Sequence, residues 1–165
     1  MSEGLSVRGV EEVQRKMEQA VRDLEGGPML QAMRDCTLLV ERDAKKNASA
    51  SVNTGMLRAS ILPEVRGEGH AIMGVVGSNL LYAAAVELGS RPHWPPPDPI
   101  LRWVQLKLQP GKDLEASVAF LIARKIARMG TKAQPYLQPA FDMNLDRIEQ
   151  RLGSAVSEIV VKANS

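Results

Sequence analysis

The order of apolar and polar positions predicts two helices at the start of the chain. Apolar residues recur at steps of three and four with glutamate and arginine between them, so we expect an amphipathic helix over residues 9–25. Pro28 suits the first turn of a second helix, whose apolar positions continue at the same period as far as Ala44. The small polar stretch 45–54 has no apolar period, which favours a surface loop.

The period changes from helical to alternating after Gly55. Apolar and polar residues alternate over 57–61, and a second β-like run follows over 71–77. Residues 66–70 are typical of a turn, so the two runs predict a β-hairpin. Pro63 has no N–H to donate, which places its strand at an edge or a bulge.

Glycine and proline divide the second half of the chain into further helices. Residues 82–88 are rich in alanine and are followed by Gly89, as in a short helix with a left-handed stop. Asp98 is expected to cap a helix over 98–108. The apolar spacing predicts another helix over 113–129.

A long helix is expected over residues 138–163. At 1.5 Å per residue it would be roughly 39 Å long. It would either project or pack on a neighbouring subunit, or else lie along its own sheet. Its apolar residues follow a heptad spacing: Phe141, Leu145, Ile148, Leu152, Ala155 and Ile159.

These elements predict an α+β fold in a single domain over 1–165. The expected architecture is a small antiparallel β-sheet covered by helices, with a long C-terminal helix. Residues 91–129 are interpreted as a helical insertion linked through prolines. The proline-rich stretch 87–101 would be a stiff connector that carries helices 98–108 and 113–129 outward from the sheet, because consecutive prolines favour an extended chain. Trp94 would anchor this connector or contact the next subunit.

Composition places the chain among ordinary globular proteins. Hydrophobic residues make up 44% and charged residues 24%, and no apolar run approaches the roughly 20 residues that cross a bilayer. The polar start has no signal-peptide core, so we expect a protein that stays in the cytoplasm and binds no membrane. The net charge of +2 gives no concentrated positive field for nucleic acid. Cys36 is alone in an apolar setting and is predicted to be a buried thiol.

No motif of a known chemistry is visible in the sequence. There is no phosphate-binding glycine loop, no paired-cysteine motif, no HExxH and no GxSxG, so we predict no catalytic residue, no metal ligand and no cofactor. An enzyme of unseen motif would use His93 and Glu87. Glu87 is consistent either with a buried or inter-subunit pair to an arginine or with a solvent-facing carboxylate.

Four stretches carry a resemblance to a known family. They are V-x-G-V-x-x-V at 7–13, N-T-G-x-L-R-x-S-I at 53–61, G-S-x-x-x-Y-A-x-x-V-E-x-G at 77–89, and G-T-K-A-Q-P-Y-L-Q-P-A at 130–140. In this order and spacing the chain resembles the small tail-component proteins of long-tailed phages, which are encoded among the head-to-tail joining genes and assigned to the virion neck.

The resemblance implies a non-enzymatic structural virion protein at the head-tail junction, made in the host cytoplasm. It would act in the neck or in tail completion, form a homo-oligomeric ring, and bind connector and tail proteins around the DNA that passes through the channel. The expected interaction residues are Thr54, Gly55, Leu57, Tyr82, Glu87, Gly89, Trp94, Pro135, Tyr136, Leu137 and Pro139.

Two interpretations of these residues stay open. The prolines around Tyr136 and Leu137 would present both side chains for docking, or would lead stiffly into the last helix with both packed in the core. The basic side chains of helix 113–129 and Lys132 would complement its helix dipole, or would make the chain a nucleic-acid-binding module.

Overall fold

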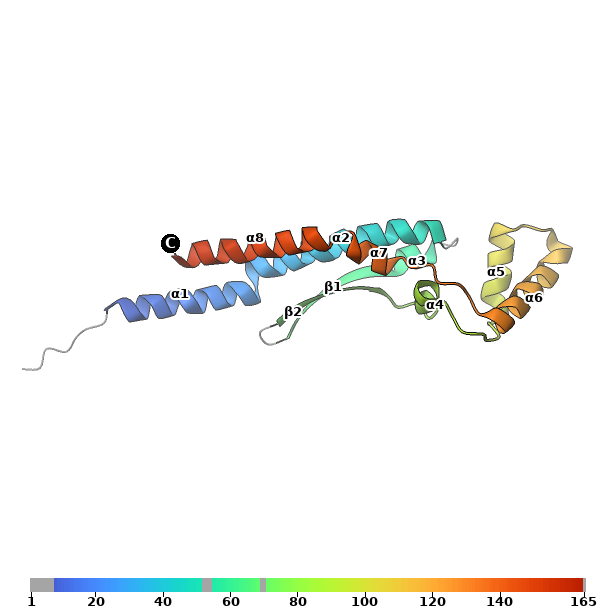
Figure 1. Ribbon diagram of the computed structural model, residues 1–165, viewed down its shortest axis with the longest axis horizontal. Coiled ribbons are helices and arrows are strands. Elements are labelled where there is room, and N and C mark those ends of the chain that lie inside the picture. Colours follow the sequence, from blue (N-terminus) through green and yellow to red (C-terminus); the bar gives the residue numbers. More distant parts are fainter. Residues whose placement is uncertain (1–7, 52–54, 69–70, 165) are drawn as a thin grey trace, which may run out of the picture. The chain divides into compact units, whose positions relative to one another are not determined.

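The structure is a computed structural model that describes residues 8–51, 55–68 and 71–164 (Figure 1). The chain forms two compact units. Residues 1–39, 63–75 and 144–165 make up the terminal unit, and residues 40–62 and 76–143 make up the central unit. The elements are α1 (Arg8–Glu25), α2 (Gly27–Ser51), α3 (Met56–Ser60), β1 (Ile61–Glu68), β2 (Ala71–Ser78), α4 (Ala83–Leu88), α5 (Pro97–Lys107), α6 (Lys112–Met129), α7 (Leu137–Asp142) and α8 (Leu145–Asn164).

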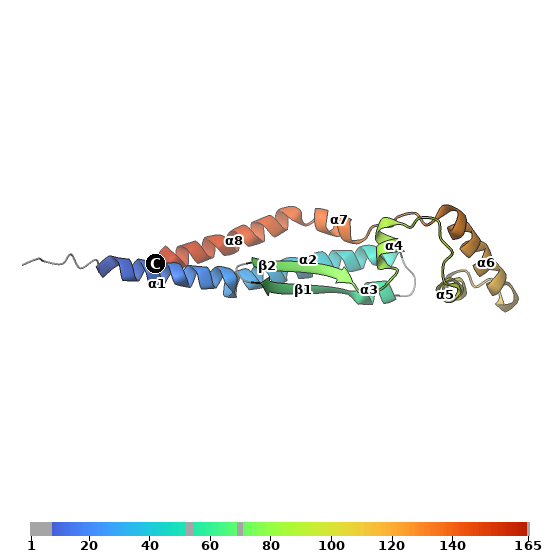
Figure 2. The same cartoon turned by 90° about the horizontal axis from the view of Figure 1, so that it is seen from below.

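The fold is α+β, as predicted, with a small antiparallel sheet and a long C-terminal helix. Strands β1 and β2 pair as a two-stranded sheet, in which both strands are edges, and they lie side by side in Figure 2. A hairpin is therefore present and its second strand lies where it was predicted, but its first strand is 61–68 and not the run 57–61; Pro63 stands in an edge strand. The prediction of a single domain over 1–165 stays a prediction.

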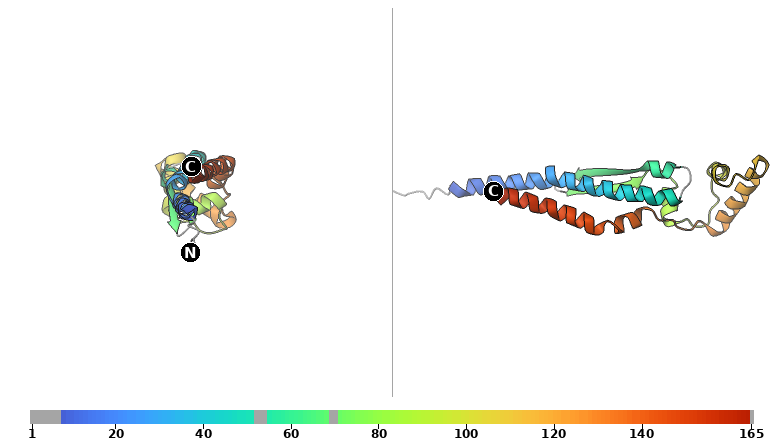
Figure 3. Two further views of the ribbon diagram at one scale, coloured as in Figure 1. Left: turned by 90° about the vertical axis from the view of Figure 1, so that its left-hand side faces the viewer. Right: turned by 90° about the horizontal axis from the view of Figure 1, so that it is seen from above.

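The terminal unit is built on three helices and the distal part of the hairpin. Helix α8 packs along α1, as Figure 3 shows, with Ala155 and Ile159 buried. Lys162 Nζ donates to Asp23 Oδ2 of α1 at 2.7 Å. Strand β2 lies so close to α2 that a β-carbon at Gly74 would meet the Thr37 side chain at 2.6 Å. Glycine lets the strand backbone pack directly against the Thr37 and Met33 side chains of the helix, which would have to shift for a larger residue.

The central unit has a core of small and aliphatic residues. Helices α5 and α6 pack against each other, with Val104 of α5 and two alanines of α6 buried. Small residues at the contact let the two helix backbones approach closely, while larger apolar side chains such as Phe120 and Leu121 stay exposed. The other buried apolar residues of the unit are Val40, Ala44, Ala48, Leu57, Ile61, Ala83, Tyr136 and Ala140.

The predicted loop at 45–54 is wrong over its first seven residues, which continue α2 to Ser51. Ala44 and Ala48 are buried and extend the four-residue spacing of Cys36 and Val40. Alanine is the best helix former, so the stretch keeps a helical face without carrying any large apolar side chain. Residues 52–54 lie outside the described residues.

The predicted strand over 57–61 is wrong as well. Residues 56–60 form the short helix α3, and β1 begins at Ile61. Leu57 and Ile61 are both buried, so they follow the four-residue period of a helical turn rather than the alternation of a strand. Residues 66–68 of the predicted turn belong to β1, and 69–70 lie outside the described residues.

Two helix boundaries differ from the prediction. Helix α5 begins at Pro97, so Asp98 lies within its first turn instead of capping it. The expected continuous helix over 138–163 is interrupted at Met143 and Asn144, between α7 and α8. The Asn144 carbonyl accepts the N–H of Ile148, and asparagine favours the position before a helix. The break shifts the phase of the heptad, so Phe141 and Leu145 are exposed.

Within the described residues, no helix combines the length and the apolar character needed to span a membrane.

Candidate functional site

Glu87 binds the start of a helix fifty residues further along the chain. Its Oε2 accepts the backbone N–H groups of Tyr136 at 2.7 Å and Leu137 at 2.9 Å, and its Oε1 accepts that of Gln138 at 2.9 Å. The first N–H groups of a helix have no partner within the helix, and a carboxylate there also complements the helix dipole. Glu87 therefore caps α7 across the fold.

The backbone pairs beside this cap. Ser90 and Thr131 exchange two backbone hydrogen bonds, of 3.0 and 3.1 Å, and the Thr131 hydroxyl bonds to the Ser90 hydroxyl at 2.9 Å. The Gln134 N–H donates to the Val86 carbonyl at 2.8 Å. Residues 86–90 and 130–138 thus form one hydrogen-bonded feature, which we call the clasp.

Two glycines allow the two segments of the clasp to approach each other closely. Gly89 has φ 75° and ψ 179°, and a β-carbon there would meet the Thr131 carbonyl oxygen at 2.6 Å. Gly130 has φ 72° and ψ −162°, and its β-carbon would overlap the carbonyl oxygen of Ser90. Both conformations are essentially restricted to glycine. The helix ends at Gly89 as predicted, but the expected left-handed conformation is wrong, since Gly89 combines a positive φ with an extended ψ.

Tyr136 is the largest fully buried side chain, with 1% of its surface exposed. Asn47 of α2 donates to its carbonyl oxygen at 3.2 Å. Burial and the nearby Glu87 carboxylate raise the pKa of the phenol above its ordinary value. This placement matches the interpretation of Tyr136 as a core residue.

The buried phenol predicts a loss of stability at alkaline pH. Because the folded-state pKa of Tyr136 exceeds the unfolded value, its contribution is fully present below about pH 10 and declines as the pH rises through the folded pKa. We expect the free energy of unfolding to fall faster in the wild type than in Tyr136→Phe above about pH 10. Chemical denaturation at a series of pH values measures this, and parallel curves for the two proteins would contradict it.

The other expected interaction residues lie at several places. Gly55 is exposed before α3 with φ 68°, Leu57 is buried, Pro135 is exposed, and Leu137 and Pro139 are half-buried in α7. Thr54 lies outside the described residues. The structure brings Glu87, Gly89, Tyr136 and Leu137 together in the clasp, and it places Leu57 in the core of the central unit.

Trp94 anchors the residues just before α5, 92–96, which we call the proline segment. Its ring lies 5.8 Å from that of Phe120 in α6, with the planes tilted by 59°. Trp94 is still 58% exposed. The proline segment therefore contacts α6 through one side of the indole, and much of the rest of the ring is exposed to solvent.

An apolar groove of about 560 Å³ opens beside the clasp in the central unit. Its walls come from α4, the proline segment, α5, α6 and the clasp. The residues that line it are Leu81, Tyr82, Ala85, Val86, Ser90, His93, Pro95, Pro96, Pro99, Ile100, Trp103, Ile122, Ile126, Thr131, Lys132 and Gln134. The volume is in the range of binding clefts, and the lining is mostly apolar with a few polar groups at its edge.

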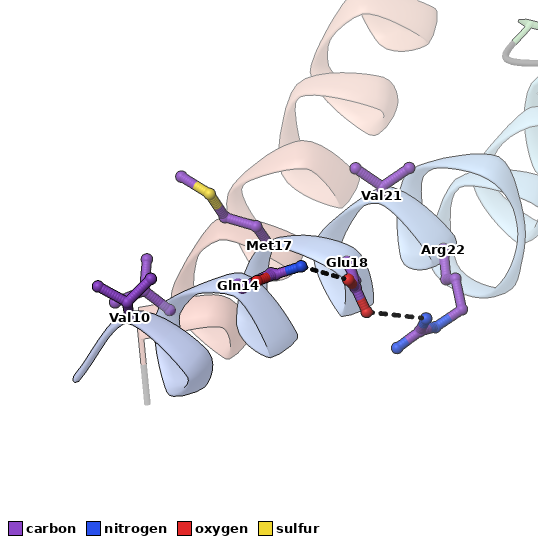
Figure 4. Close-up of a pocket in the computed structure, with 7 residues that line it drawn as sticks. Val10, Gln14, Met17, Glu18, Val21 and Arg22 are labelled. Carbon is purple, nitrogen blue, oxygen red and sulfur yellow. Dashed lines mark hydrogen bonds and ion pairs between the residues drawn. The ribbon is translucent and has the colours of Figure 1, made fainter. Parts of the chain in front are cut away.

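The second exposed feature is the apolar face of α1, which we call the α1 stripe: Val10, Val13, Met17, Val21 and Leu24. These side chains are 42–66% exposed. Figure 4 shows that the hollow along this face is lined by α1 residues, with Glu18 joined to Gln14 at 3.3 Å and to Arg22 at 4.0 Å. The stripe is therefore an open surface on the side of a helix.

His93 and Glu87, the two residues that an enzyme of unseen motif would use, both bond to backbone groups. His93 Nδ1 bonds to the Arg91 carbonyl at 2.9 Å, while both oxygens of Glu87 accept backbone N–H groups. In the described part of the chain, no group of three or more His, Cys, Asp or Glu side chains could hold a metal ion. Cys36 is buried, as predicted, and burial raises the pKa of its thiol.

Sequence reasoning missed several residues of these features. Ser90 of the clasp and Ala85, Ile100 and Trp103 of the groove were not among the expected interaction residues, and neither were Gly130 and Thr131, although both lie in the stretch 130–140. The only early signal was the pair of glycines that follow helices at 89 and 130. The clasp pairs residues that are 41 positions apart, and such pairing produces no periodic pattern in the local sequence.

Comparison of this chain with family models, with curated proteins and with solved structures gave no match.

Proposed function

We propose that this protein is a structural, non-enzymatic component of a phage particle at the head-tail junction, where it binds its own copies and connector or tail proteins. The support is the resemblance of four stretches to the tail-component family, together with the way two of those stretches meet. The clasp joins Glu87 and Gly89 of the stretch 77–89 to the stretch 130–140. If the family pattern exists for a structural reason, its residues should contact one another, and Glu87 does bond to the backbone of Tyr136 and Leu137.

The exposed surfaces support binding to macromolecules. The groove and the α1 stripe are apolar faces, and faces of this kind commonly mark sites of interaction. A neck protein meets several neighbours at once, so two separate faces on one small chain suit that place. The choice between neck and tail completion rests on which neighbours it binds.

The test is genetic and uses electron microscopy. We expect a stop codon in the gene to yield a lysate with DNA-filled heads and separate tails, and a plasmid copy of the gene to restore joined particles. Gold-labelled antibody should then mark the junction of complete particles. Joined, infectious particles without the protein would contradict the proposal.

The alternative is a nucleic-acid-binding module that uses α6. Arg124, Lys125 and Arg128 are all exposed near its end. Binding through these side chains would weaken steeply with salt, because each phosphate contact releases a counterion. DNA binding of that kind by the purified chain, lost in a triple alanine variant, would favour the alternative.

A further inference from the structure

The groove and the α1 stripe are two exposed apolar features of complementary kinds, a hollow and the side of an amphipathic helix. The groove is concave and lies in the central unit, whereas the α1 stripe is the side of a helix in the terminal unit. An amphipathic helix that lies in an apolar groove is a recurring mode of recognition. We propose that copies of this chain associate head to tail, with the α1 stripe of one copy seated in the groove of the next.

The stripe is suited to be the inserted element. It keeps a helical spacing for four turns, and its largest side chain, Met17, is 66% exposed. Helix α1 meets α8 on a different side, through Asp23, so the described residues of the terminal unit leave the stripe exposed. Methionine and valine are side chains that fill an apolar groove well.

The groove is suited to be the receptor because its walls are held in place. The Ser90 and Thr131 pairing and the bond from Gln134 to Val86 join α4 to the clasp. The ring contact of Trp94 with Phe120 fixes the proline segment to α6. Prolines 95, 96 and 99 line the groove and stiffen its rim. A preformed groove costs little ordering when it binds.

The charges of the two units favour this pairing over others. The terminal unit holds 9 basic and 12 acidic residues, a net charge of −3, and the central unit holds 12 basic and 7 acidic residues, a net charge of +5. Glu11, Glu18 and Arg22 flank the stripe, with Glu18 paired to Arg22 at 4.0 Å. Lys132 lies in the groove lining, and the attraction therefore rests on the net charges of the units. Attraction between opposite charges therefore brings the terminal unit of one copy to the central unit of another.

The same charges disfavour a symmetric dimer through α1. Two α1 helices would bring together two terminal units that each have a net charge of −3. Different faces on the two partners make the contact heterologous, so an open assembly keeps one free groove at one end and one free stripe at the other until it closes into a ring. The inference deepens the proposed function, because a ring in the neck would need such a contact.

The experiment uses the full chain and two variants that each remove one face. Met17→Glu places a charge in the stripe, and Ala85→Glu fills the groove with an acid that repels Glu11 and Glu18. Light scattering after size-exclusion chromatography should show wild-type oligomers that dissociate as the salt concentration rises. Each variant should raise the dissociation constant of self-association at least about tenfold.

Mixing the two variants is the decisive step. The Met17→Glu copy keeps an intact groove and the Ala85→Glu copy keeps an intact stripe, so the mixture should form a complex of two chains and no larger species. Leu38→Glu and Leu106→Glu are the matched controls, since both leucines are half-exposed and lie outside the stripe and the groove lining. Both controls should assemble like the wild type.

Each other outcome overturns the inference. A monomeric wild type at its highest soluble concentration removes self-association, and association that only Met17→Glu disrupts, without rescue in the mixture, indicates α1 pairing with α1. Circular dichroism checks folding, and Trp103→Glu replaces Ala85→Glu if that variant unfolds. This experiment needs no phage, so its failure leaves a head-tail role with another contact standing, and failure of the genetic test leaves the head-to-tail contact standing.

Discussion

Gly130→Ala should lower the free energy of unfolding of the central unit by about 3 kcal/mol or more, the largest effect we expect from a single methyl group. The backbone at Gly130 has φ 72° and ψ −162°, which a residue with a side chain rarely adopts. The new β-carbon would overlap the Ser90 carbonyl oxygen and lie 2.9 Å from the carbonyl carbon of Arg91. Both obstacles are backbone, so the clasp would have to open to make room.

Gly153→Ala is the matched control and should act in the opposite direction. Gly153 lies inside α8, and a β-carbon there would meet no atom within 4 Å. Alanine should therefore stabilise the helix by about 1 kcal/mol. Thermal melts and urea titrations of the two variants give the comparison. Equal stabilities for both would mean that the approach of residues 90 and 130 does not constrain the fold.

The periodic parts of this fold could be predicted from sequence. Helices α1 and α6 and the start of α2 carry repeating apolar faces, and the run at 71–77 reads as a strand. Gly89 and Gly130 mark helix ends because a positive φ favours glycine at any such place. These signals are local, so the single sequence contains them.

The errors occur where local preference is weak. Residues 45–51 are small and polar, and their helix depends on the burial of Ala48. Residues 57–61 fit an alternating pattern by sequence, and the burial of Leu57 together with Ile61 decides for a helical turn instead. Tertiary packing overrides propensity in both stretches.

The candidate site was visible only in part. Tyr136 and Glu87 stood out by sequence, yet the bond between the Glu87 carboxylate and the Tyr136 N–H spans 49 residues and no spacing rule encodes it. The amphipathic pattern of α1 was equally clear, but a pattern shows that a helix has an apolar face and not whether its own chain covers it. The long-range contacts and the uncovered faces needed the structure.

Glu87→Ala should destabilise the chain by about 2–4 kcal/mol, because it removes the acceptor of three backbone N–H groups at the start of α7. Tyr136 is buried and its N–H would lose a charged partner, whereas Gln138 is exposed and water can replace the carboxylate there. The loss should therefore be less than three separate hydrogen bonds. Amide exchange at residues 136–138 should accelerate together with the fall in the free energy of unfolding.

Two further variants test whether the lost stability comes from the helix cap at α7 or would follow from the removal of any glutamate. Glu64→Ala removes a carboxylate that is 55% exposed and paired with Arg66, so its effect should stay within about 0.5 kcal/mol. Glu87→Gln keeps the shape and one carbonyl acceptor but replaces the other oxygen with an NH₂ that faces backbone donors, so its cost should fall between those of Glu64→Ala and Glu87→Ala. If Glu87→Ala were no more harmful than Glu64→Ala, α7 would be held by the burial of Tyr136 and Ala140 alone, and the carboxylate would contribute nothing measurable to the clasp.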